Sequence, residues 1–142
     1  MMLLFGGWLM QAALTQLLPS AWWAPDLLVA GLVLGVLKQP ARWVALSAAA
    51  GVCAAVWAIR APAVICLSYV GLGLAVRVAI RQWDVSDRRT QCLLIGAASG
   101  ALTGLAVWID TLWSFPVAAL MLLRAVITGL LVWWLQQRRA LS

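Results

Sequence analysis

Few side chains in this 142-residue sequence could carry out chemistry. Its four carboxylates are Asp26, Asp84, Asp87 and Asp110, and it has no histidine. Without histidine, the chain lacks the commonest ligand of zinc and of haem iron and the usual general base. The sequence also has no glycine-rich phosphate loop, no nucleophile placed beside a base and no metal-ligand spacing. We therefore expect no enzymatic activity, no metal and no cofactor.

Arg124 is the exception, because it lies inside an apolar segment. It follows Pro116 by eight residues, a distance of about 12 Å along a helix. An arginine near the middle of a bilayer costs at least about 2.5 kcal/mol, so it needs partners. We expect Arg124 to face inward and to hydrogen-bond to Gln11 and Thr103, because the three residues lie at similar depths along their segments. The alternative is that the Arg124 side chain snorkels to the outer interface. We place all four carboxylates at loops or interfaces, so the counter-charge of Arg124 would come from a partner chain, a lipid phosphate or a ligand.

The composition identifies the chain as an integral membrane protein. Hydrophobic residues make up 65% of it, charged residues 10%, and the mean hydropathy is +1.01. These values lie far outside the range of soluble proteins. A net charge of +6 would indicate nucleic-acid binding in a soluble protein, but here the charges stand at the ends of apolar segments, as in membrane proteins. We expect a single membrane domain, residues 1–142, and no nucleic-acid partner.

The elements that must position Arg124 are apolar segments long enough to be membrane helices. A bilayer core of about 30 Å needs about 20 apolar residues, with about 17 as a lower limit. Six segments approach that length, so the sequence predicts an all-α bundle of six transmembrane helices. The segments are 1–18, 22–37, 43–59, 62–80, 92–109 and 116–135.

The basic residues predict how these segments are oriented. Short loops rich in lysine and arginine stay on the cytoplasmic side of a membrane. The longest polar stretch, R-Q-W-D-V-S-D-R-R-T-Q at 81–91, is such a loop. If it is cytoplasmic, one basic residue, Arg60, lies in an outer turn together with Asp26 and Asp110. Seven lie inside: Lys38, Arg42, Arg81, Arg88, Arg89, Arg138 and Arg139. We therefore expect both termini in the cytoplasm.

Small residues recur at four-residue spacing in several segments. In lipid, such stripes let helix backbones approach closely and gain van der Waals contact. The sequence predicts helix-packing positions at Gly96, Gly100 and Gly104, at Gly31 and Gly35, and at Ser47, Gly51 and Ala55. The glycine triple indicates that the fifth helix is central in the bundle or lies in an interface.

Two segments of the sequence resemble the MreD family, the rod shape-determining membrane proteins of bacteria. The segment P-D-L-L-V-A-G-L-V-L-G-V-L at 25–37 is similar to the family's proline-led second helix. The segment L-L-R-A-V-I-T-G-L-L-V-W-W-L-Q-Q-R-R at 122–139 resembles its last helix, which often has an arginine near its start and a basic end. The family's third span usually has a glycine followed four residues later by aspartate, where this chain has Gly51 and Ala55.

The resemblance implies a non-enzymatic, multi-pass protein of the bacterial inner membrane. It would act in the cell-elongation machinery, with an MreC-like scaffold and the glycosyltransferase–transpeptidase pair of peptidoglycan synthesis as partners, besides membrane lipid. The family fold is also similar to that of the substrate-capturing S-components of energy-coupling-factor transporters. Two alternatives therefore stay open: a subunit that binds a vitamin-like small molecule, and an accessory subunit of another membrane complex.

Overall fold

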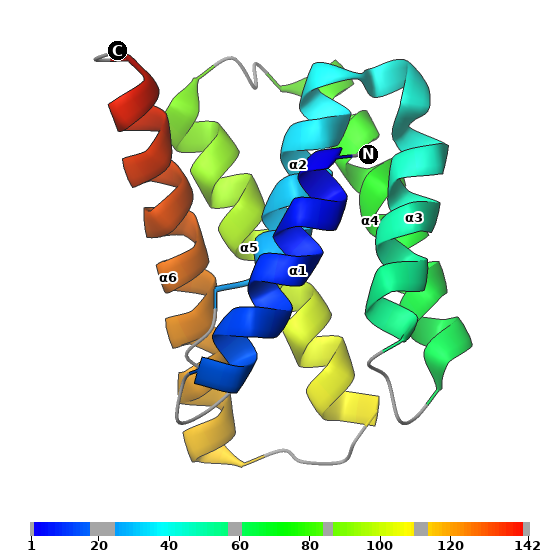
Figure 1. Cartoon of the computed structure of the whole chain (residues 1–142), viewed down its shortest axis with the longest axis vertical. Coiled ribbons are helices and arrows are strands. Elements are labelled where there is room, and N and C mark those ends of the chain that lie inside the picture. Colours follow the sequence, from blue (N-terminus) through cyan, green and yellow to red (C-terminus); the bar gives the residue numbers. More distant parts are fainter. Residues whose placement is uncertain (1, 18–24, 57–60, 84–86, 110–113, 141–142) are drawn as a thin grey trace.

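The computed structural model describes residues 2–17, 25–56, 61–83, 87–109 and 114–140, and this part of the chain is all-α with no strand. Figure 1 shows its helices packed side by side as a bundle. The elements are α1 (Met2–Leu17), α2 (Leu27–Lys38), the 3-10 turn η2 (Pro40–Arg42), α3 (Trp43–Ala55), α4 (Pro62–Gln82), α5 (Arg88–Ile109) and α6 (Phe115–Ala140).

Successive helices alternate in direction along the bundle (Figure 1). The start of α1 and the end of α6 lie toward the upper end in that view. The end of α2, the start of α3, the end of α4 and the start of α5 lie there too. These helix ends carry most of the basic side chains, so one end of the bundle is basic. The residues concerned are Lys38, Arg42, Arg81, Arg88, Arg89 and Arg138.

Three helices in the described part of the chain are long and apolar enough to cross a membrane. They are α4, α5 and the segment Phe115–Arg138 of α6. Helices α2 and α3 are shorter than the spans that the sequence predicts. In the predicted second span, 22–37, the helix begins at Leu27, and residues 22–24 lie outside the described part. Helix α3 ends at Ala55 rather than at 59, and residues 57–59 lie outside the described part. At 1.5 Å per residue the 12 residues of α2 rise about 18 Å, well short of a bilayer core of about 30 Å.

Helix α2 forms the core of the bundle. Six of its residues are buried, and Val29, Leu32, Val33 and Val36 have no or almost no exposed surface. Helices α1, α3, α4 and α5 pack around it. A helix that is apolar all round is typical of the core of a protein or of a membrane span, and α2 is in the core of this bundle. Since α2 is central, the chemistry at its two ends decides what lies inside the bundle.

Candidate functional site

The start of α2 lies near mid-height in the bundle. The backbone N–H of Asp26 donates to Thr128 Oγ1 at 2.9 Å, and Thr128 is close to the midpoint of α6 (Phe115–Ala140). The backbone N–H of Leu28 donates to Oε1 of Gln11, which lies in the second half of α1. In Figure 1, α2 accordingly begins about halfway along the bundle, behind α1. Helix α2 therefore extends from the interior of the bundle to the basic end.

Asp26 and Arg124 form a buried charge pair. Arg124 Nη2 lies 3.9 Å from Asp26 Oδ2, and the two side chains are 17% and 6% exposed. Two predictions were therefore wrong: Asp26 is not in an exposed outer turn, and the counter-charge of Arg124 comes from this chain. A carboxylate inside an apolar bundle is stable as an ion only beside a cation, and the same holds for the guanidinium. The inward orientation expected for Arg124 agrees with this pair.

The backbone at the start of α2 is fully hydrogen-bonded by the chain itself. Besides the two bonds above, Leu27 N–H donates to Pro25 O at 3.0 Å, Val29 N–H to Asp26 Oδ1 at 3.3 Å, and Ala30 N–H to Asp26 O at 3.1 Å. All five N–H groups from 26 to 30 thus have acceptors. The first N–H groups of a helix have no partner within the helix, and in lipid no water is present to supply one. Side chains of Gln11, Asp26 and Thr128 supply three of these acceptors, and the backbone oxygens of Pro25 and Asp26 supply the other two.

Two further polar side chains converge on the charge pair. Ser99 of α5 is fully buried, and its hydroxyl lies beside the Asp26 carboxylate and interacts with it. Tyr69 of α4 is buried within electrostatic range of both Asp26 and Arg124. We refer to Gln11, Asp26, Ser99, Arg124 and Thr128 as the polar cluster. It connects α1, α2, α5 and α6 at mid-height.

The two partners predicted for Arg124, Gln11 and Thr103, make no hydrogen bond to it in the described part of the chain. Gln11 is in the polar cluster but bonds to the backbone of α2, and no hydrogen bond joins it to Arg124. Thr103 is buried on α5 and likewise makes no hydrogen bond to Arg124 in the described part of the chain. Arg124 Nε is buried and has no partner there. The polar cluster therefore contains the predicted inward-facing Arg124 together with Gln11. The hydrogen bonds predicted to join Arg124 to Gln11 and Thr103 are not formed among the described residues.

Four of the predicted glycine positions, Gly35, Gly96, Gly100 and Gly104, lie at helix contacts. A Cβ on Gly96 or Gly100 would lie 3.4 Å or 3.6 Å from atoms of Ala125, and one on Gly104 would lie 3.0 Å from Met121 Cε. The triple thus faces α6. A Cβ on Gly35 would lie 3.4 Å from Leu46 of α3, and Gly31 is half-buried on α2.

Asp26 and Thr128 were the functional residues that sequence reasoning missed. Counting residues from the basic end of the bundle would have indicated that Asp26 and Arg124 lie at the same depth. Counted back from Lys38, Asp26 is 12 residues away, about 18 Å, and counted back from Arg138, Arg124 is 14 residues away, about 21 Å. Measured from that end, the two charges come out at similar depth. An apolar run such as 22–37 suggests a helix that begins at the outer surface, so the sequence alone places Asp26 in an outer turn.

Replacing Thr128 by valine is expected to reduce the free energy of unfolding by about 1 kcal/mol. Valine keeps the shape but removes the acceptor of the Asp26 N–H, which then has no partner in an apolar interior. Unfolding in a detergent–denaturant titration measures the change. The matched control is Ser68→Ala, because the Ser68 hydroxyl donates only to Val64 O of its own helix at 2.6 Å. An equal loss in both variants would contradict a bridging role for Thr128.

Comparison of the chain with protein-family models, with curated proteins and with solved structures found no match. The resemblance to the MreD family therefore depends on the two segments quoted above.

Proposed function

We propose that this chain is a non-enzymatic scaffold of the bacterial inner membrane that acts by helix–helix contacts with other membrane proteins. The observation that carries the proposal is the completed start of α2. In transporters, half-helices that begin at mid-membrane direct free N–H groups at an anionic substrate. Here the chain's own oxygens occupy all five N–H groups from 26 to 30. A polar cluster closed in this way stabilises the bundle instead of recognising a ligand.

The lateral surface of the bundle supports the same proposal. Only 22%, 28% and 17% of the span windows of α4, α5 and α6 are buried inside the chain. Large apolar side chains cover the rest, such as Leu67, Leu93 and Leu122, each at least 70% exposed. In a membrane this surface faces lipid or the helices of partner proteins. A small core with a large apolar exterior suits a protein that works by lateral contact.

We further propose six membrane passes with both termini in the cytoplasm. The alternation of the helices and the gathering of basic side chains at one end support this topology. Helices α2 and α3 are too short to span alone. The backbone at Pro25 and Asp26 is not helical, and such irregular backbone is tolerated in a membrane where it is buried in protein, as Asp26 is.

By its resemblance to the MreD family, the chain would work in the cell-elongation machinery. Tagged protein isolated in mild detergent is expected to bring with it an MreC-like scaffold and a glycosyltransferase–transpeptidase pair, identified by mass spectrometry. The control is an unrelated six-span membrane protein expressed at the same level. Recovery of an ATPase with its coupling subunit instead would overturn the proposal, and so would a stable monomer that carries a bound vitamin.

One observation favours a second function, a substrate-capturing subunit of a transporter. Arg124 Nε is a buried polar atom without a hydrogen-bond partner among the described residues, and the Arg124 side chain lies beside Asp26 at the start of α2. A small molecule with an acceptor group would bond to it. Mass spectrometry of the purified protein under non-denaturing conditions distinguishes the two functions, since only a capturing subunit retains a small molecule that Arg124→Lys releases.

A further inference from the structure

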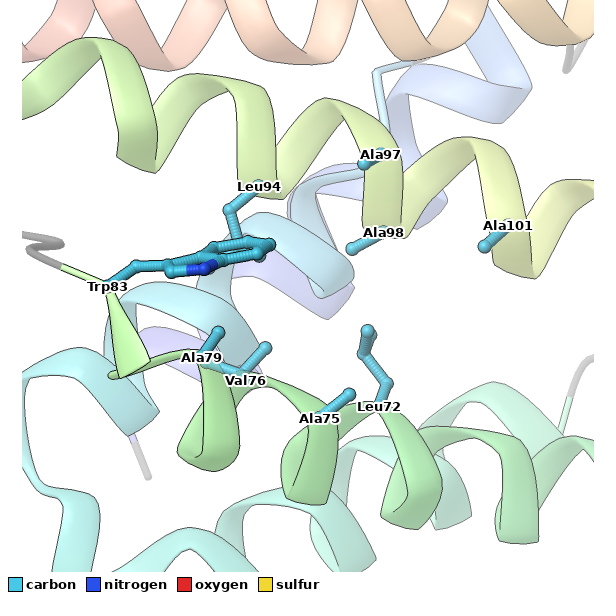
Figure 2. A pocket seen from close by; sticks show the side chains of 9 residues that line it. All are labelled: Leu72, Ala75, Val76, Ala79, Trp83, Leu94, Ala97, Ala98 and Ala101. Carbon is cyan, nitrogen blue, oxygen red and sulfur yellow. The ribbon is translucent and has the colours of Figure 1, made fainter. Parts of the chain in front are cut away.

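An apolar groove runs between α4 and α5 (Figure 2). Its volume is about 290 Å³. Ala75 and Ala79 on α4 and Ala97, Ala98 and Ala101 on α5 make most of its walls, together with Leu72, Val76, Trp83 and Leu94. Figure 2 shows the alanines of the two helices facing each other and the indole of Trp83 lying across the groove beside Leu94.

The groove is about as long as one half of a bilayer core is thick. On α4 its lining extends from Leu72, the middle of the helix Pro62–Gln82, to Trp83, just past the helix end. Eleven residues at 1.5 Å each give about 17 Å, close to half of a bilayer core of about 30 Å. A partner's transmembrane helix would lie along the full thickness of the core. A groove of this length matches the acyl chain of a lipid in a single leaflet.

The end of the groove that Trp83 lines is at the basic end of the bundle. Arg81 precedes Trp83 on α4, Arg88 and Arg89 begin α5, and all three side chains are exposed. The carboxylate in this region of the described chain is Asp87, whose Oδ1 accepts the backbone N–H of Arg89 at 3.3 Å. Trp83 is 62% exposed, and an indole suits the level of lipid headgroups. Basic residues beside a groove between membrane helices favour anionic headgroups.

We infer that the groove between α4 and α5 binds an anionic phospholipid of the leaflet at the basic end. One acyl chain lies along the alanines, and the phosphate lies among Arg81, Arg88 and Arg89. The exposed alanines Ala75, Ala97 and Ala101 leave room for the chain, whereas larger side chains would fill the groove. This inference is independent of the scaffold function proposed above, because it needs only the groove and the arginines beside it.

The test uses purified full-length protein in detergent, with lipid retention measured by mass spectrometry under non-denaturing conditions. Phosphatidylglycerol is expected to be retained over phosphatidylcholine with the same acyl chains. Arg81→Gln and Arg88→Gln are each expected to weaken its retention by about five-fold. Ala97→Leu and Ala101→Leu are expected to abolish it, because they occupy the groove. Glycerol phosphate, which has the charge but no chain, is expected not to compete.

The matched controls are Arg42→Gln and Ala119→Leu, an exposed arginine at the basic end and an exposed alanine on α6, both away from the groove. Both are expected to retain phosphatidylglycerol as the unaltered protein does. Equal retention of the two lipids would overturn the inference, and so would full retention by Ala97→Leu. Effective competition by glycerol phosphate, or a polypeptide helix seated in the groove that lipid does not displace, would overturn it as well. None of these results depends on which proteins co-purify with the chain.

Discussion

Replacing Asp26 by asparagine is expected to reduce the free energy of unfolding by about 3–5 kcal/mol. Asparagine can still accept the N–H of Val29 as an N-cap, so the substitution removes the charge and leaves the cap. The Arg124 guanidinium then stays inside the bundle without a carboxylate. Arg124→Met is expected to cost a similar amount, because it leaves the buried carboxylate without its cation. Denaturant titration in mixed micelles measures both changes.

The double variant Asp26→Asn/Arg124→Met separates the charge pair from the packing around it. Replacing both partners of a buried pair costs much less than removing one, because no charge is left unpaired. We therefore expect the double variant to be more stable than either single variant. Single-variant losses that simply add would contradict the pair, since additivity is the behaviour of residues that do not interact. Additive losses would instead support the alternative in which the Arg124 side chain snorkels to an interface.

The long helices could be predicted from the sequence because their signal is local. Helices α4, α5 and α6 are long apolar runs that each begin or end beside basic residues, and the structure extends the predicted boundaries by a few residues. For α5, Arg88 and Arg89 of the polar stretch already lie in the first turn. Hydropathy alone identifies such segments, because a bilayer selects for length and apolarity and for little else.

The start of α2 could not be located by hydropathy. Trp22, Trp23 and Ala24 are apolar or amphipathic, so the run into Leu27 looks like the beginning of a span, and Pro25-Asp26 looks like a surface turn. What decides the outcome is tertiary: Gln11 and Thr128, 17 and 102 residues away from their partners, supply acceptors in the interior. Asp26 is stable in the interior of the bundle only because residues far away in the sequence bond to this segment. No local sequence pattern can predict those contacts.

Replacing Gly51 by alanine is expected to reduce the free energy of unfolding by about 3 kcal/mol. Gly51 is buried where α3 packs against α4, and a Cβ there would lie 2.8 Å from the backbone oxygen of Cys66 and 3.1 Å from its Cα. Backbone atoms cannot rotate away as the end of a side chain can, so the two helices would have to separate. Their separation would also weaken the contact of Ser47 with Gly73, the other close approach between them. Thermal unfolding in detergent measures the loss.

Gly71→Ala is the matched control, because a Cβ at Gly71 meets nothing within 4 Å. Alanine is the better helix former by about 1 kcal/mol, so this variant is expected to be as stable as the unaltered protein or slightly more stable. The two substitutions are chemically the same and lie on neighbouring helices, so helix propensity favours both equally. A difference between them therefore measures the close approach of α3 and α4. If Gly51→Ala were as stable as Gly71→Ala, the two helices would not be in the close contact that the structure gives them.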